Sequence, residues 1–108
     1  MSRRKSDSRH NKLVKEIAQR LERKGYSVQT LVNYQRNGYE GEFDVYARMN
    51  GVHEYHEIKS RNSKKNIRRA LKQFQRARKA YPNRNWAFYL DTPDGEDRYY
   101  VRRNRNVA

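Results

Sequence analysis

The chain contains no cysteine, only two prolines, and no apolar run long enough to cross a bilayer. Without cysteine, disulfides and thiolate metal sites are excluded. No stretch has the apolar core of a secretory signal, so an intracellular, cytoplasmic protein is expected. Hydrophobic residues make up only 34% of the 108 positions, but they recur with a regular period. We therefore expect a small folded core and not a disordered chain.

Acidic residues are also scarce. The chain has 12 Asp and Glu against 26 Lys and Arg, which gives a formal net charge of +14. Such a charge attracts polyanions, and binding should depend steeply on salt. Nucleic acid, DNA in particular, is the expected partner. A membrane surface is not, because the sequence lacks the exposed apolar anchors it would need.

The length predicts one domain, which we place at residues 10–103, after a basic arm at 1–9 and before a polar tail at 104–108. Leu13, Ile17 and Leu21 recur every four residues and predict an amphipathic helix over 10–24, ended by Gly25. A strand is expected at 26–34, followed by a polar loop at 35–41.

The second half of the chain predicts another helix and two more strands. An apolar stripe predicts a helix over 63–81, which Pro82 stops. A short apolar run at 86–90 predicts a buried strand, a turn follows at 92–95, and an edge strand is expected at 98–102. The expected fold class is therefore α/β, a single mixed β-sheet flanked by helices, in the order α-β-β-β-α-β-β.

Asn50-Gly51 separates two alternating runs, at 42–49 and 52–60, and predicts a two-residue hairpin. In that register Asp44 lies directly opposite Glu57, and Glu42 lies opposite Lys59. Opposed residues share a face with Cβ atoms roughly 4.5–5.5 Å apart. Two carboxylates so close repel each other unless a cation lies between them.

A divalent metal with oxygen ligands suits such a pair, and Mg²⁺ is expected, with Mn²⁺ as a substitute. Asp44 and Glu57 are the candidate ligands, and Lys59 adds a cation on the same face. The alternative is two solvated residues on an exposed sheet face. Unpaired like charges in that position would cost roughly 0.2–1 kcal/mol, which favours a metal site. No small-molecule cofactor beyond the metal is expected.

Basic residues crowd the second helix, where eight cations have no acidic partner. They could form only a solvated face, but their number favours phosphate contact. The candidate DNA-binding residues lie on this helix and on the N-terminal arm: Arg3, Arg4, Lys5, Lys64, Lys65, Arg68, Arg69 and Lys72.

One pattern in the chain resembles the PD-(D/E)XK nuclease superfamily. It consists of Gly41-Glu42-Phe43-Asp44-Val45, then Glu57-Ile58-Lys59 after a hairpin, then a helix and a strand. Within this superfamily, the pattern is similar to small archaeal-type Holliday junction resolvases with a restriction-endonuclease-like fold, over roughly residues 10–90. The resemblance implies that Asp44 and Glu57 ligate Mg²⁺ and that Lys59 orients or activates the attacking water. It also implies that Glu16 completes the metal environment and that a homodimer cuts two strands symmetrically.

Several residues depart from this pattern or have a second interpretation. Phe43 stands where the motif has proline, and Gln73 is followed four residues later by Ala77, not by the Tyr of exonuclease-like branches. Glu16 could instead pair with a basic residue one helical turn away. Glu42 is expected to be the structural partner of Lys59.

The expected function is a metal-dependent endodeoxyribonuclease, structure-selective on branched DNA and acting as a homodimer. One alternative is another nuclease of the same superfamily, a nickase or a single-strand end processor. The other is a non-catalytic basic nucleic-acid-binding module on the same scaffold.

Overall fold

The computed structural model describes residues 8–101. Its elements follow the predicted order: α1 (Ser8–Arg23), β1 (Ser27–Arg36), β2 (Tyr39–Met49), β3 (Val52–Ile58), α2 (Lys64–Ala80), β4 (Asn85–Thr92) and β5 (Gly95–Tyr99). The strands form one five-stranded mixed sheet in the order β1-β2-β3-β4-β5. Only β3 and β4 run parallel, because α2 crosses over between them. The predicted α/β class and the single mixed sheet are confirmed.

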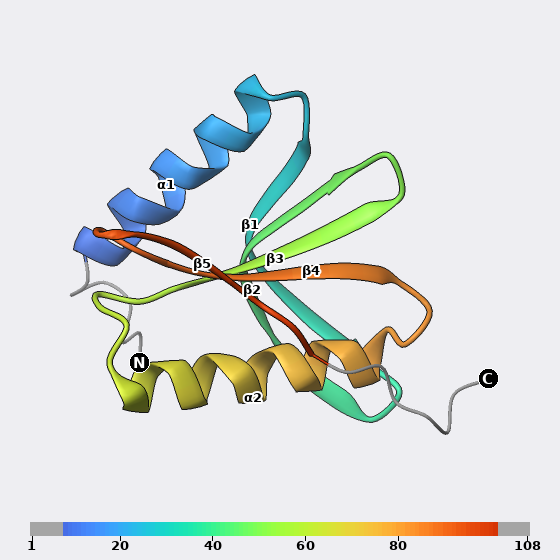
Figure 1. Cartoon of the computed structure of the whole chain (residues 1–108). Helices are drawn as coiled ribbons and strands as arrows, with labels where there is room; N and C mark the ends of the chain where they lie inside the picture. The colour runs from blue at the N-terminus through green and yellow to red at the C-terminus, as the bar shows by residue number, and fades with distance from the viewer. Residues whose placement is uncertain (1–7, 102–108) are drawn as a thin grey trace.

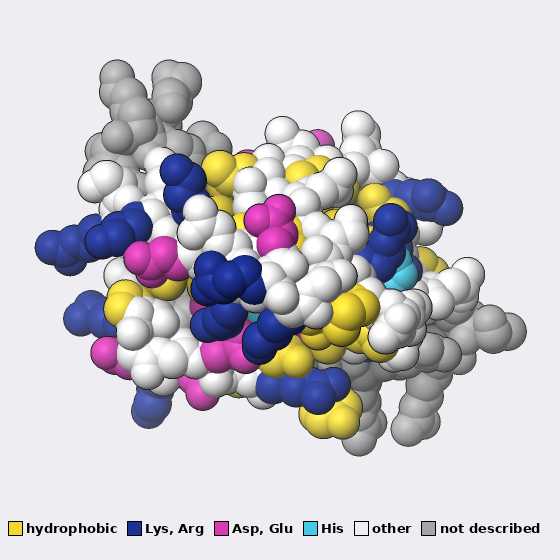
Figure 2. Space-filling model, turned by 90° about the horizontal axis from the view of Figure 1, so that it is seen from above, with side chains coloured by type: hydrophobic (Ala, Val, Ile, Leu, Met, Phe, Trp, Pro, Cys, Tyr) yellow, Lys and Arg dark blue, Asp and Glu magenta, His cyan; other side chains and the backbone are white. Residues whose placement is uncertain are grey.

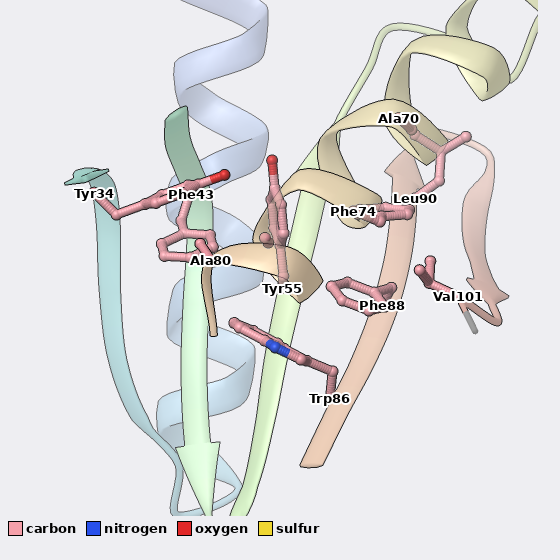
Figure 3. Close-up of a cluster of buried hydrophobic side chains, with 11 residues drawn as sticks. Tyr34, Phe43, Tyr55, Ala70, Phe74, Ala80, Trp86, Phe88, Leu90 and Val101 are labelled. Atoms are coloured by element: carbon pink, nitrogen blue, oxygen red, sulfur yellow. The ribbon is translucent and has the colours of Figure 1, made fainter. Parts of the chain in front are cut away.

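The sheet lies between the two helices, which cover opposite faces (Figure 1). On the α2 face an aromatic core gathers around Tyr55, Phe74 and Phe88. Figure 3 shows Tyr55 standing between β2 and α2, beside Phe43 and Phe74. On the α1 face a smaller aliphatic core includes Ile17 and Val45. Each helix therefore buries its apolar stripe on its own side of the sheet.

The hairpin at Asn50-Gly51 has the predicted register. Both residues have the left-handed φ of the expected turn, 52° and 78°. The β2–β3 ladder runs from Met49 opposite Val52 to Val45 opposite His56. The register of the two strands that carry the motif is thus as predicted.

The prediction of a polar loop at 35–41 is wrong. The chain makes a second tight hairpin there: β1 continues to Arg36, Asn37 and Gly38 turn with φ of 53° and 80°, and β2 begins at Tyr39. The same Asn-Gly signal that marked the first hairpin is present here, but polar neighbours concealed the strands on either side of it.

The remaining boundaries shift by a few residues. Strand β4 extends to Thr92, which is matched to Gly95 in the β4–β5 ladder. The Thr92 hydroxyl accepts a hydrogen bond from the Asp94 N–H (3.3 Å) in the turn between them. The last strand is therefore Gly95–Tyr99 and not 98–102. Helix α2 begins after Ser63, whose hydroxyl accepts from the Asn66 N–H (3.2 Å). Residues 1–7 and 102–108, which contain the proposed arm contacts Arg3, Arg4 and Lys5 and the tail, lie outside the described residues.

Within residues 8–101, neither helix is long and apolar enough to span a membrane.

A network of charged side chains, buried around His56 and more exposed at Arg20 and Glu96, joins α1 to the sheet on the α1 face. His56 Nδ1 lies 2.7 Å from Asp91 Oδ2, and its Nε2 lies 2.8 Å from Glu54 Oε1. Arg20, on α1, lies 3.0 Å from Glu96 Oε2 and 3.8 Å from Asp91 Oδ1. Since each ring nitrogen of His56 faces a carboxylate, both carry hydrogen and the ring is an imidazolium. Burial alone would lower the pKa of His56, but the bonds to Asp91 and Glu54 raise it to about 9.

This network predicts that stability falls at alkaline pH. The folded-state pKa of His56 lies above the ordinary 6.5, so its stabilising contribution is complete below pH 6.5 and is lost as the pH rises through about 9. Urea unfolding of the parent and of His56→Gln should show a difference in unfolding free energy that shrinks by roughly 3 kcal/mol between pH 6 and pH 9.5. A difference that stays constant over this range would show that folding does not raise the pKa of His56.

Candidate active site

A cleft of about 810 Å³ opens at the end of the sheet where the β2–β3 ladder stops. Its walls come from the first turn of α1, the β1–β2 hairpin, α2 and the β4–β5 turn. Asp44, Glu57 and Lys59 all line it. The cleft also contains Glu40 and Glu42, so four of the 12 acidic residues of a very basic chain meet here.

Asp44 lies where the regular geometry of β2 is broken. Residues two positions apart on a regular strand point to the same face of the sheet. Phe43 nevertheless packs in the α2-side core, and Val45 packs in the α1-side core. Opposite Asp44 on β1, Leu31 has a left-handed φ of 53°, and the two do not pair in the ladder. The Asp44 side chain reaches across to β3, where its Oδ2 accepts the Ile58 N–H at 3.0 Å. A backbone hydrogen bond therefore fixes this carboxylate at the floor of the cleft.

Glu57 is almost fully buried, with 4% of its surface exposed. Its Oε1 accepts the Tyr55 hydroxyl (2.8 Å), and its Oε2 lies 3.3 Å from Lys59 Nζ. Burial and the neighbouring negative charge of Asp44 raise the pKa of Glu57 to about 7, while Lys59 and the Tyr55 hydrogen bond oppose the rise. The predicted repulsion between the two carboxylates is therefore present, although the ladder itself ends one residue short of this pair.

The β2–β3 ladder does not extend to the expected pair of Glu42 and Lys59. Lys59 forms its ion pair with Glu57, and Glu42 is matched to Asn33 on β1. The irregularity of β2 at Asp44 ends its pairing with β3, so the simple hairpin register does not extend to Glu42.

Helix α1 brings His10 to the cleft. His10 Nε2 lies 3.4 Å from Asp44 Oδ2, and both side chains are largely buried. Glu16, which the resemblance places in the metal environment, is exposed and does not line the cleft. No sequence pattern marked His10, because its partner is 34 residues away and on another element.

Gln73 reaches the same site through Tyr55. The Tyr55 hydroxyl lies 2.8 Å from Glu57 Oε1, 3.2 Å from the Glu42 carbonyl oxygen and 3.4 Å from Gln73 Oε1. Because a hydroxyl has a single hydrogen to donate, the shortest contact identifies Glu57 as its acceptor. Tyr55 thus contacts Glu57, while Gln73 lies beside the Tyr55 hydroxyl and itself lines the cleft.

The basic side of α2 borders this cleft. Asn66 and Gln73 of α2 form part of its wall. The five helix cations proposed to contact DNA are all exposed: Lys64, Lys65, Arg68, Arg69 and Lys72. Arg78 does not belong to this face, because it is buried and donates to the carbonyl oxygens of Arg84 (3.2 Å) and Val101 (3.3 Å). Basic side chains are also spread over the face seen in Figure 2, with acidic ones among them.

The donors in the cleft suit a hard divalent cation. Carboxylate oxygens of Asp44 and Glu57 are ligands for Mg²⁺ and Mn²⁺, and a bound cation would relieve the repulsion that raises the pKa of Glu57. A second group, His56, Asp91 and Glu96, has ligand atoms within 4.8 Å of one another. There the imidazolium and Arg20 already neutralise the carboxylates, and His56 would have to lose a proton to bind a metal.

No family model matches the chain, and no curated protein matches it. A solved structure of a protein of unknown function, AF1548, has a similar fold, with a TM-score of 0.57 and 25% identical residues. The match covers 74% of this chain and 46% of the other, so the chain spans less than half the length of that protein. This similarity is consistent with the α/β arrangement and gives no information about function.

The strained carboxylate pair predicts that the site costs stability when no metal is present. The folded-state pKa of Glu57 lies above the ordinary 4.5, so the parent should lose stability as the pH rises from about 4.5 to about 7. Glu57→Gln removes that loss. In EDTA at pH 8 this variant should be more stable than the parent by roughly 1–3 kcal/mol in urea unfolding.

Glu16→Gln is the matched control, because Glu16 is exposed and outside the cleft. It should unfold like the parent. Added Mg²⁺ or Mn²⁺ should stabilise the parent and this control but not Glu57→Gln. Equal stability of all three proteins in EDTA would argue against a destabilising charge at Glu57.

Proposed function

We propose that the protein is a metal-dependent endodeoxyribonuclease of the PD-(D/E)XK type, with a restriction-endonuclease-like fold and Mg²⁺ as its metal. The observation that supports this most strongly is that Asp44, Glu57 and Lys59 line one cleft. That acidic cleft lies in a chain of net charge +14, whose surface suits the phosphate backbone.

Asp44 and Glu57 are the proposed metal ligands, and each is held in place. The Ile58 N–H fixes Asp44, and the Tyr55 hydroxyl fixes Glu57. When bound, the metal would neutralise phosphoryl charge and lower the pKa of a water molecule. Rigid placement of the ligands on strand ends is what such a site requires.

Lys59 is the proposed catalytic cation. Its ammonium group lies 3.3 Å from Glu57 Oε2, beside the proposed metal ligand. From this position it can donate a hydrogen bond to the attacking water or to a phosphoryl oxygen, stabilising negative charge as it develops. The site therefore combines groups that orient the nucleophile with groups that neutralise the phosphate.

Branched DNA is the proposed substrate, cut by a homodimer in the cytoplasm. Exposed cations on α2 beside the cleft provide phosphate contacts, which position a nucleic acid without reading its sequence. A domain this small has little room for base recognition in addition to the site, so DNA shape should dominate selectivity. A single-strand end processor is the second candidate, because Gln73 lies in the cleft beside the Tyr55–Glu57 contact.

Asp44→Asn should abolish metal-dependent cleavage while DNA binding survives or tightens, because the ligand charge is lost and the fold is kept. Cleavage of a labelled four-way junction, a Y-fork, a linear duplex and a single strand in Mg²⁺ or EDTA measures this. Paired symmetric cuts in the junction alone would support a resolvase, and cutting of single strands alone the second candidate. Metal-independent cutting, or cutting unchanged in Asp44→Asn, would exclude the proposed site.

Neutralising Lys65, Arg68 and Arg69 together should weaken binding to every DNA tested. If each contacts one phosphate, the slope of log K against log salt should decrease by about 2.7 for duplex DNA. Fluorescence anisotropy between 50 and 300 mM salt, in EDTA, measures the slope. A slope equal to that of the parent would show that this face of α2 does not contact DNA.

A further inference from the structure

Two arginines lie over one tyrosine ring at the C-terminal end of α2. The Arg84 guanidinium is 3.8 Å from the Tyr81 ring centroid, and the Arg36 guanidinium is 5.5 Å from the same centroid. Tyr81 is the C-cap residue of α2, and Arg36 is the last residue of β1. Cation–π contact holds a guanidinium flat on the ring and leaves N–H groups at its edge to bind an anion.

This pair, which we call the Arg36–Arg84 anchor, has no acidic partner among residues 8–101. Neither guanidinium forms an ion pair there, whereas Arg20 on the other face of the sheet is paired with carboxylates. Burial lowers the pKa of the nearby His53, and the positive charges of Arg84 and of Arg48 on β2 lower this pKa further. The anchor is therefore a local concentration of unneutralised positive charge.

The anchor is connected to the cleft by aromatic contacts. Tyr34 lines the cleft, and its ring centroid is 5.9 Å from that of Tyr81. Asn37, in the β1–β2 turn, donates to the Ala80 carbonyl oxygen at 2.8 Å and holds this hairpin against the end of α2. Gln73 of α2 lines the cleft, and Tyr81 lies eight residues further on, which corresponds to about 12 Å of helix.

We propose that the Arg36–Arg84 anchor is a second binding site for nucleic-acid phosphates, which holds the strand that leaves the cleft along the β1 side of α2. This inference rests on the proposed nucleic-acid substrate and extends it. From the last residue of α2 that lines the cleft, the substrate reaches about 12 Å further, or three to four base pairs at 3.4 Å per step. Duplex and single-stranded arms have the same phosphate chemistry, and the test separates them.

The test compares Arg36→Ala/Arg84→Ala with a control that also removes two positive charges. Arg23→Ala/Arg98→Ala is that control, because both arginines are exposed, and Arg98 likewise lies over a tyrosine, 5.9 Å from the Tyr89 ring centroid. Binding of a 20-mer duplex and a 20-mer single strand is measured in EDTA by anisotropy across a salt series. Loss of two phosphate contacts should reduce the slope by about 1.8 for duplex or about 1.4 for single strands.

Trp86 gives an independent readout, since it is the one tryptophan of the chain. Its indole N–H donates to the Tyr81 carbonyl oxygen at 3.1 Å, and the Arg84 guanidinium is 5.6 Å from its ring centroid. DNA that contacts the anchor should change Trp86 emission in the parent and in the control. The change should be absent in Arg36→Ala/Arg84→Ala.

The anchor is supported if Arg36→Ala/Arg84→Ala reduces the salt slope of DNA binding and abolishes the change in Trp86 emission. The control must keep both the slope and the emission change of the parent. The strand type that shows the loss identifies the arm that it holds. Equal reductions of the salt slope in the two variants would indicate a general effect of net charge and would overturn the anchor. An unchanged slope in both variants would overturn it as well. If the double variant fails to fold, Arg36→Ala alone suffices, because Arg36 is exposed, and its slope should fall by about one.

The outcome is separate from that of the cleavage assay. Binding in EDTA requires no catalysis, so the anchor can be confirmed in a protein that cuts nothing. Conversely, if Asp44→Asn abolishes cleavage while Arg36→Ala/Arg84→Ala leaves the salt slope unchanged, the result would support the proposed nuclease and exclude the anchor.

Discussion

The arrangement of the site follows from two carboxylates held side by side in a nearly dry position at the end of a β-ladder. Asp44 and Glu57 are 5% and 4% exposed, and their mutual repulsion helps to raise the pKa of Glu57 to about 7. Such an arrangement lowers stability unless the charges are compensated. Lys59 offsets part of this cost, as do the hydrogen bonds from the Ile58 N–H and the Tyr55 hydroxyl. Retaining a costly pair on a rigid sheet is characteristic of a site that binds a cation.

The two faces of the sheet contribute differently to this site. The α2 face supplies an aromatic core, and Tyr55 extends from it to hold Glu57. The α1 face holds a compensated charge network around His56, and α1 also delivers His10 to the cleft. Adjacent residues of β3 thus lie in opposite electrostatic environments. His56 is an imidazolium between carboxylates, whereas Glu57 faces another negative charge.

Local signals in the sequence predicted most of the fold. The two helices were recognised from apolar spacing, and Asn50-Gly51 set the register of β2 and β3. The second Asn-Gly hairpin was missed because its strands are mostly exposed and show no alternation of polar and apolar residues. Strand ends moved by a few residues, because hydrogen bonds of a turn such as that of Thr92 decide where a ladder stops.

The sequence by itself determined that Asp44, Glu57 and Lys59 lie at the same end of the hairpin, because a two-residue turn has only one register. Only the tertiary structure decided which other groups surround them. His10 replaces Glu16 at the cleft, and Lys59 pairs with Glu57, because the break in β2 and the position of α1 arise from packing between distant segments. Such contacts have no periodic signature in a single sequence, and they appear only when the whole core is assembled.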